Sequence, residues 1–190
     1  MKIAQYVMAY EAEQDRIRAI LPAGYRSLRP VLRINAEIRA DAEGYIEFNT
    51  AVERDGSKGW LNIGCWRPVP FVRQEDRVTF QAPFLSISFS PIGIAGACPA
   101  EKDNSGCWFV GKDPVHRPPE LIRSNKEFCD CSFRWQFTDA DAHGISIGKT
   151  LPAIPTPVQT VYPRQDFTPE NAAGIPCKQV LGAYMVVFDR

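Results

Sequence analysis

The sequence predicts a mainly β domain with one short helix near its N-terminus, most simply a closed or nearly closed antiparallel barrel. Three observations favour this fold class. Short runs of alternating apolar and polar residues recur along the chain, as at Leu85–Phe89, where the apolar residues alternate with serines. A charged turn that contains glycine, Asp55–Gly59, separates two β-rich runs in the manner of a hairpin. Sixteen prolines and 13 glycines favour short strands and turns over long helices.

The first half of the chain contains the clearest elements. Glu11–Leu21 is predicted as a short helix, because its apolar residues recur at helical spacing before Pro22 ends it. The expected strands of this half, in order, are Lys2–Tyr10, Val31–Arg39, Tyr45–Glu53 and Gly59–Trp66. The last two form the hairpin. Within the third strand, Tyr45, Glu47 and Asn49 share one face, because side chains alternate along a strand.

The second half is less regular. Its expected strands are Arg77–Gln81, Phe84–Phe89, Phe128–Phe137 and Gln179–Phe188. Pro91–Gly111 is rich in glycine and small residues, which indicates a loop or an irregular pair of strands. Asp113–Pro119 contains three prolines and is expected to be irregular. Glu120–Lys126 is expected to form a helical turn, and Leu151–Pro163 is expected to be extended.

Length and composition narrow the class of protein. At 190 residues and 45% hydrophobic, the chain is expected to form a single domain, residues 1–190. Lysine plus arginine equals aspartate plus glutamate at 22 each, which argues against nucleic acid or an anionic membrane as a partner. Charged residues between Glu11 and Arg18 interrupt the N-terminus, so we expect no signal peptide and a cytoplasmic protein. We expect no cofactor. The sequence leaves open whether the protein forms a homo-oligomer.

The six cysteines predict thiols rather than a metal site. Cys129 and Cys131 share one face of a strand, but their spacing is one residue short of a zinc knuckle and no matching second pair exists. A four-sulfur site that adds Cys98 and Cys107 is the alternative. We expect reduced cysteines in the core, with no structural disulfide and no stoichiometric zinc.

The order of short motifs in the first third carries a family resemblance. A strand leads to a short helix that ends in Leu21-Pro22-Ala23-Gly24, and a Pro-Val-Leu strand, a Tyr-x-Glu strand at Tyr45–Glu47 and a Gly-x-x-Gly hairpin at Gly56–Gly59 follow. This order resembles the first half of acetoacetate decarboxylase and its relatives, over about residues 5–66. The resemblance implies a β-barrel with an internal, polar-lined cavity.

The resemblance also implies site residues. Enzymes of that family form a Schiff base between a lysine and a ketone or keto acid, and two glutamates in the cavity position the substrate. One of these glutamates corresponds to Glu47, and the other falls close to Asn35. The family's adjacent lysine pair has no counterpart, because no lysine occurs between Lys58 and Lys102. Lys102 lies in a polar stretch, whereas Lys112 follows an apolar run. Of the two, Lys112 is therefore the better candidate for a cavity lysine.

Further residues are candidates for ligand binding. Tyr45 and Asn49 share the face of Glu47 and are expected beside it. Arg33 and Arg134 lie in strands with apolar neighbours, and an inward-facing arginine would bind a ligand carboxylate through two parallel hydrogen bonds. An arginine on the barrel exterior is the ordinary alternative.

Three functions follow from these observations. The first is an acetoacetate decarboxylase-like protein with a cavity for a small keto acid or related carbonyl compound, acting as a carbon–carbon lyase. The second is a non-catalytic small-molecule-binding or sensory barrel that lost the Schiff-base lysine. A metal- or thiol-dependent activity is the third. The missing lysine pair favours the second function over the first.

Overall fold

The computed structural model describes residues 1–40, 42–82, 85–97, 106–109, 115–119, 122–135, 140–141, 144–145, 159–160, 175 and 177–190. The first elements are β1 (Lys2–Glu11), α1 (Gln14–Ile20), β2 (Arg26–Ile38), β3 (Gly44–Arg54), β4 (Ser57–Arg67), β5 (Phe71–Gln74), β6 (Arg77–Ala82) and β7 (Leu85–Gly96). They are followed by β8 (Cys107–Phe109), β9 (Val115–Arg117), β10 (Lys126–Trp135), β11 (Ala140–Asp141), β12 (Gly144–Ile145), β13 (Gln159–Thr160) and β14 (Gln179–Asp189). Among the described residues no helix has the length and apolarity that a membrane crossing requires.

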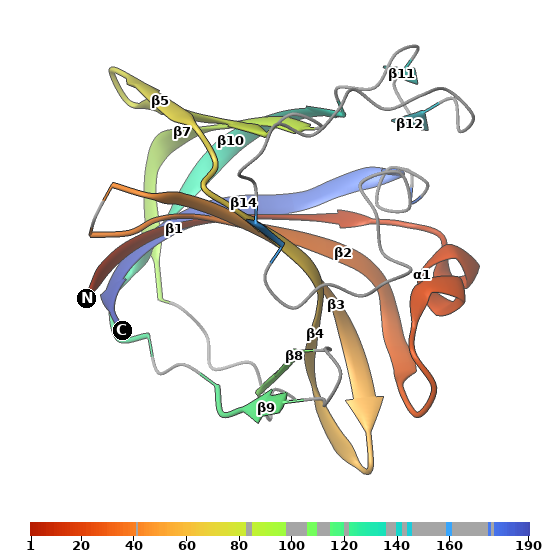
Figure 1. Cartoon of the computed structure of the whole chain (residues 1–190). Coiled ribbons are helices and arrows are strands. Elements are labelled where there is room, and N and C mark those ends of the chain that lie inside the picture. Colours follow the sequence, from red (N-terminus) through yellow and green to blue (C-terminus); the bar gives the residue numbers. More distant parts are fainter. Residues whose placement is uncertain are drawn as a thin grey trace.

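Most of the described strands belong to one large, mostly antiparallel sheet (Figure 1), and β11 and β12 pair in a separate two-stranded sheet. The strand order of the large sheet is β5-β6-β7-β10-β14-β1-β2-β3-β4-β8-β9, and β13 pairs with β4. This sheet bends, so that β5, β7 and β10 form a layer on one side of the β1–β4 strands while β8 and β9 lie on the other side (Figure 1). The mainly β fold is therefore confirmed, and closure into a barrel stays a prediction.

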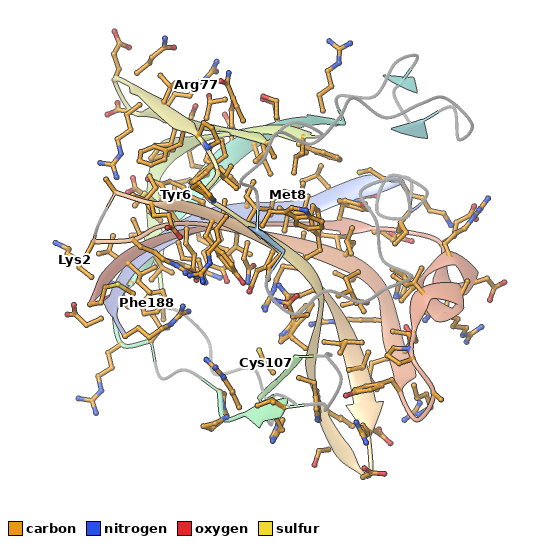
Figure 2. All side chains as sticks on the ribbon, viewed as in Figure 1. Lys2, Tyr6, Met8, Arg77, Cys107 and Phe188 are labelled. Carbon is orange, nitrogen blue, oxygen red and sulfur yellow. The ribbon has the colours of Figure 1, made fainter. Side chains whose placement is uncertain are left out.

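The main hydrophobic core lies between the layer of β6, β7 and β10 and the strands β1–β4. Tyr6 and Met8 of β1 belong to this core, together with Ile34 of β2 and Phe80 and Phe89 from the opposite layer. Tyr6 and Met8 point to one side of the sheet and Phe188 of β14 to the other (Figure 2). The alternation of side chains thus gives β1–β4 one face in the core and a second face turned away from it.

Most strands of the first half match the sequence prediction within a few residues, while the second half corrects several expectations. β7 continues as a strand to Gly96, because Pro91 and Ala95 pair with β10 across a bulge, and β8 follows, so the described part of residues 91–111 fits the strand alternative of the prediction rather than the loop. β9 is a short strand inside the stretch expected to be irregular, since its residues pair with β8. Residues 122–125 form no helix, and β5 was not predicted.

Candidate functional site

The strand register places a row of polar side chains on the sheet face that turns away from the core. Across β2 and β3 the facing pairs are Arg33 with Asn49, Asn35 with Glu47, and Glu37 with Tyr45. These pairs are two residues apart along each strand, so all six side chains share one face. The intervening residues, such as Ile34 and Phe48, belong to the core.

A β-bulge extends this polar face onto β4. Glu47 lies opposite Cys65 and Asn49 lies opposite Asn62, so a step of two residues on β3 corresponds to a step of three on β4. In a regular strand residues 62 and 65 would face opposite sides, because side chains alternate. The extra residue of the bulge turns both Asn62 and Cys65 to the face of Glu47.

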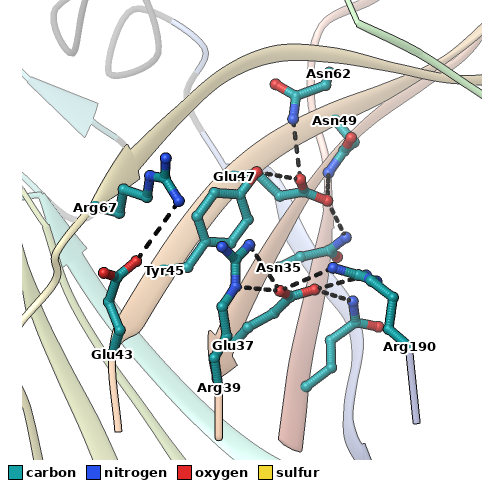
Figure 3. Close-up of polar contacts among 11 residues, drawn as sticks. Asn35, Glu37, Arg39, Glu43, Tyr45, Glu47, Asn49, Asn62, Arg67 and Arg190 are labelled. Atoms are coloured by element: carbon teal, nitrogen blue, oxygen red, sulfur yellow. Dashed lines mark hydrogen bonds and ion pairs between the residues drawn. The ribbon is translucent and has the colours of Figure 1, made fainter. Parts of the chain in front are cut away.

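Glu47 lies at the centre of a hydrogen-bond network of neutral side chains (Figure 3). Its Oε1 accepts hydrogen bonds from Asn35 Nδ2 at 2.8 Å and from Asn49 Nδ2 at 3.1 Å. Its Oε2 accepts one from the Tyr45 hydroxyl at 2.7 Å and one from Asn62 Nδ2 at 3.0 Å. Four donors from three strands therefore fix the orientation of one carboxylate.

Tyr45 connects this network to a neighbouring arginine. The Arg39 guanidinium lies over the Tyr45 ring, 4.0 Å from its centroid. Burial, the negative charge of Glu47 and the nearby Cys65 thiol raise the pKa of Tyr45 far above its usual value. The phenol consequently keeps its proton at neutral pH and remains a donor to Glu47.

Glu37 is the second carboxylate on this face, and it is bonded differently. Its side chain is 1% exposed. Arg39 Nη2 lies 3.1 Å from Oε2, and Arg190 Nη2 lies 3.1 Å from Oε1. Gln5 Nε2 adds a hydrogen bond of 3.0 Å to Oε1. Two guanidinium groups thus balance the charge of Glu37 within the protein (Figure 3).

Arg33 borders the network on the side away from Glu37. Its guanidinium lies over the Trp60 ring of β4, 3.7 Å from the centroid. A guanidinium on the face of an indole is attracted by the electrons of the ring. This stacking holds the plane of the Arg33 guanidinium in one orientation. Asn49 is the register partner of Arg33 on β3.

Two amide oxygens of the network accept no hydrogen bond. Asn35 Oδ1 and Asn62 Oδ1 are buried and lack a partner among the described residues. The two side chains are 3% and 0% exposed respectively. The polar face therefore contains two buried acceptors whose hydrogen-bonding capacity is unused.

The structure brings together most of the residues that the sequence predicted for a site. Arg33, Asn35, Tyr45, Glu47 and Asn49 all lie in this row. The structure does not bring Arg134 to it: that residue lies exposed on β10, and β14 and β1 separate β10 from β2. The predicted Lys112 lies outside the described residues.

Sequence reasoning missed Glu37, Asn62 and Cys65 as members of this face. Alternation from Asn35 places Glu37 on the same face, so that signal was present in the sequence. Asn62 and Cys65 depend on the bulge, which no local motif announces.

A surface depression of about 620 Å³ lies elsewhere, at the end of β14. Its lining residues are Lys2, Arg123, Ser124, Asn125, Glu127, Met185, Val186, Val187, Phe188 and Asp189. None of the residues bonded to Glu47 belongs to this lining.

Comparison with known proteins identifies the fold. No family model and no curated protein matches the sequence. Among solved structures, the acetoacetate decarboxylase of Legionella pneumophila is similar with a TM-score of 0.57 and 14% identity, over 98% of this chain and 81% of that one. An acetoacetate decarboxylase-like enzyme from Sphingomonas wittichii RW1 gives a TM-score of 0.55 and 8% identity, over 98% and 87% of the two chains.

A third similar structure contains a keto acid. It is the enduracididine biosynthesis enzyme MppR complexed with pyruvate, with a TM-score of 0.52 and 12% identity, over 98% of this chain and 84% of that one. Sequence identities this low show that the fold is shared, and they do not identify the activity of this chain. The family-like motifs of the first third and the structural similarity over nearly the whole chain agree: this chain has the acetoacetate decarboxylase-like fold.

Proposed function

We propose that this chain binds a small keto acid or a related carbonyl compound on the polar face around Glu47. The observation that carries the proposal is the bonding of the Glu47 carboxylate, whose four hydrogen-bond donors within the described part of the chain are all neutral. Glu37, by contrast, is bonded to two arginines. The negative charge of Glu47 is therefore available to an electropositive group of a ligand, whereas that of Glu37 is balanced within the protein.

Arg33 supports a ligand that carries a carboxylate. It stands on β2 two residues from Asn35, the register partner of Glu47, and on the same face. Successive residues on one face of a strand are about 7 Å apart, which suits a molecule of a few carbon atoms. The planar guanidinium can bind a carboxylate through two parallel hydrogen bonds. The ligand would then span from Arg33 to Glu47, and the pyruvate complex of MppR is a precedent for keto acid binding in this fold.

A carbon–carbon lyase is the second candidate, and it depends on an amine. β8 ends at Phe109, whose register partner on β4 is Asn62, and Lys112 follows three residues later in the sequence. An amine that reached Glu47 would add to the ligand carbonyl. The resulting carbinolamine would lose water and form an imine. The Glu47 carboxylate would stabilise the positive nitrogen of the protonated imine. The absence of an adjacent lysine pair in the sequence favours binding without catalysis.

Calorimetric titration with pyruvate and acetoacetate tests the binding proposal. We expect saturable binding to the unaltered protein. Arg33→Gln should weaken it roughly tenfold to a hundredfold, because a charge-assisted hydrogen bond contributes about 1.5–3 kcal/mol. Glu47→Gln should also weaken binding, and the exposed Arg134→Gln is the matched control that should leave it unchanged. Equal loss in Arg33→Gln and Arg134→Gln, or no binding at all, would contradict the proposal.

Borohydride trapping separates the two candidates. Borohydride reduces an imine to a stable secondary amine, which mass spectrometry detects and peptide mapping locates. With pyruvate or acetoacetate we expect little or no covalent adduct, because no lysine occupies residues 59–101. A stoichiometric adduct on Lys112 that disappears in Lys112→Arg would show imine formation and favour the lyase candidate instead.

A further inference from the structure

The orientation of the amides around Glu47 is fixed by chemistry. An ionised carboxylate only accepts hydrogen bonds, so Asn35 and Asn62 must both turn their NH2 groups toward it. Their carbonyl oxygens then point away from Glu47. A rotated amide would place its oxygen against the carboxylate, and two acceptors repel each other. The two unused acceptors are thus a consequence of the Glu47 network.

Both oxygens are deeply buried. The Asn35 and Asn62 side chains are more than nine-tenths buried, and each oxygen lacks a donor among the described residues. Buried polar groups are normally paired, because leaving water without a new hydrogen bond is costly. Asn49 provides an internal comparison: it donates to Glu47 in the same way, yet its oxygen is not among the buried unpaired atoms.

We propose that the ligand of this site carries a hydrogen-bond donor, an O–H or N–H group, which Asn35 Oδ1 or Asn62 Oδ1 accepts. This inference rests on the proposed function and names its substrate class: keto acids with a hydroxyl or amino substituent, in preference to those with a plain alkyl chain. The carboxylate of such a ligand lies at Arg33. The donor-bearing chain lies beside Glu47, where the two unpaired buried amide atoms, Asn35 Oδ1 and Asn62 Oδ1, are both acceptors.

The selectivity follows from the difference between the two kinds of ligand. A donor-bearing ligand satisfies a buried acceptor, whereas an alkyl analogue of the same shape excludes water and leaves that acceptor unpaired. A site that hydrogen-bonds a ligand hydroxyl discriminates strongly against analogues without that hydroxyl. An apolar pocket discriminates much less against analogues that lack one methylene group. We therefore expect a preference of at least about tenfold for the hydroxylated ligand.

Two matched pairs of keto acids test this preference by calorimetric titration of the unaltered protein. Hydroxypyruvate and 2-oxobutyrate differ by a hydroxyl in place of a methyl group, and 4-hydroxy-2-oxobutyrate and 2-oxopentanoate extend the comparison by one carbon. We expect the hydroxylated member of at least one pair to bind at least tenfold more tightly. Equal affinities within both pairs would overturn the inference while leaving the proposed function intact. Binding of none of the four compounds would overturn both.

Three alanine variants locate the preference. Asn35→Ala and Asn62→Ala each remove one unpaired oxygen together with one donor to Glu47, whereas Asn49→Ala removes only a donor to Glu47 from this set. We expect the ratio of affinities within the discriminating pair to fall toward one in Asn35→Ala or Asn62→Ala and to persist in Asn49→Ala. A ratio that survives in both test variants, or that is lost equally in Asn49→Ala, would refute the assignment. If a variant does not fold, the ligand pairs on the unaltered protein still decide.

Discussion

Glu37 and Glu47 are both carboxylates on the same sheet face, and their partners give them different roles. Glu37 is bonded to two arginines and a glutamine, so its charge is balanced within the protein and its role is structural. Among the residues that the structure describes, those that hold Glu47 are neutral donors. A carboxylate that is oriented but not neutralised is the arrangement expected of a group that contacts a ligand.

The thiols of β10 give a prediction at the scale of single residues. Burial, the first cause in each case, raises the pKa of Cys129 to about 11 and that of Cys131 to about 12 from a usual value of 9.0. At pH 8 the reactive thiolate fraction should then be about a hundredfold lower for Cys129 and about a thousandfold lower for Cys131 than in the unfolded chain. Site-resolved alkylation rates, measured in buffer and in denaturant, should differ by these factors.

The same shift has a consequence for stability, with a definite sign. Above pH 9 the thiols of the unfolded chain lose their protons while those of the folded chain keep them. The contribution of both groups to the free energy of unfolding should therefore be complete below pH 9 and decline as the pH rises toward 11–12. Rapid alkylation of Cys131 in the native protein at pH 8 would show that the thiol is not buried.

At the residue scale, alternation was sufficient to place Tyr45, Glu47 and Asn49 together, because one strand contains all three. It could not place Asn35 or Asn62 against Glu47, since that depends on how three strands align. Register is determined by contacts between strands, which a single sequence does not display.

At the scale of elements, strands with a clear alternation were predictable and those defined by their partners were not. β1, β3, β4 and β14 were recognised within a few residues. β9 is a strand because it pairs with β8, and its proline-flanked sequence indicated the opposite. The bulge in β4 belongs to the same class, because it is defined by the mismatch with β3.

Contact between β4 and the residue before β8 predicts the effect of a glycine substitution. A Cβ added at Gly59 would approach the Gly106 carbonyl oxygen to 2.2 Å and the Trp108 ring to 2.8 Å. Gly59→Ala must therefore displace β8 from β4 and should lower the free energy of unfolding by about 1–3 kcal/mol. Urea unfolding measures this difference as a shift of the midpoint, provided that the dependence of the free energy of unfolding on urea concentration keeps the same slope.

Gly182→Ala is the matched control for that experiment. It also lies in a strand, but a Cβ there would meet nothing within 4 Å. Its effect should be small, or slightly stabilising by up to about 1 kcal/mol through the unfolded chain. Two variants of equal stability would disprove the close packing of β4 against residue 106.

At the scale of the whole molecule, the Glu37 cluster joins parts of the chain that are far apart in sequence. Gln5 comes from β1, Glu37 and Arg39 from β2 and its end, and Arg190 from the residue after β14. These strands are neighbours at the centre of the sheet. The cluster therefore fixes the end of the polar face and, through Arg39 and Tyr45, supports the position of Glu47.

This cluster predicts a large effect of one substitution on stability. Glu37→Gln leaves Arg39 and Arg190 without their shared carboxylate, and removal of one partner from a buried pair typically costs about 3–5 kcal/mol. Because Arg190 is partly exposed, we expect the lower end of that range. The control Glu53→Gln removes a surface pair with the exposed Arg26 and should cost less than about 1 kcal/mol. Equal midpoints of urea unfolding for the two variants would contradict this role of Glu37.

The position of a bound keto acid tests most directly whether the polar face is the ligand site. A crystal structure of the protein soaked with hydroxypyruvate would show it. We predict ligand density on the face of β2, β3 and β4, with the carboxylate at Arg33 and the hydroxyl within hydrogen-bond distance of Asn35 Oδ1 or Asn62 Oδ1. Density confined to the surface depression beside Arg123 and Asp189, or none near Glu47 at saturating ligand, would contradict the assignment of this site.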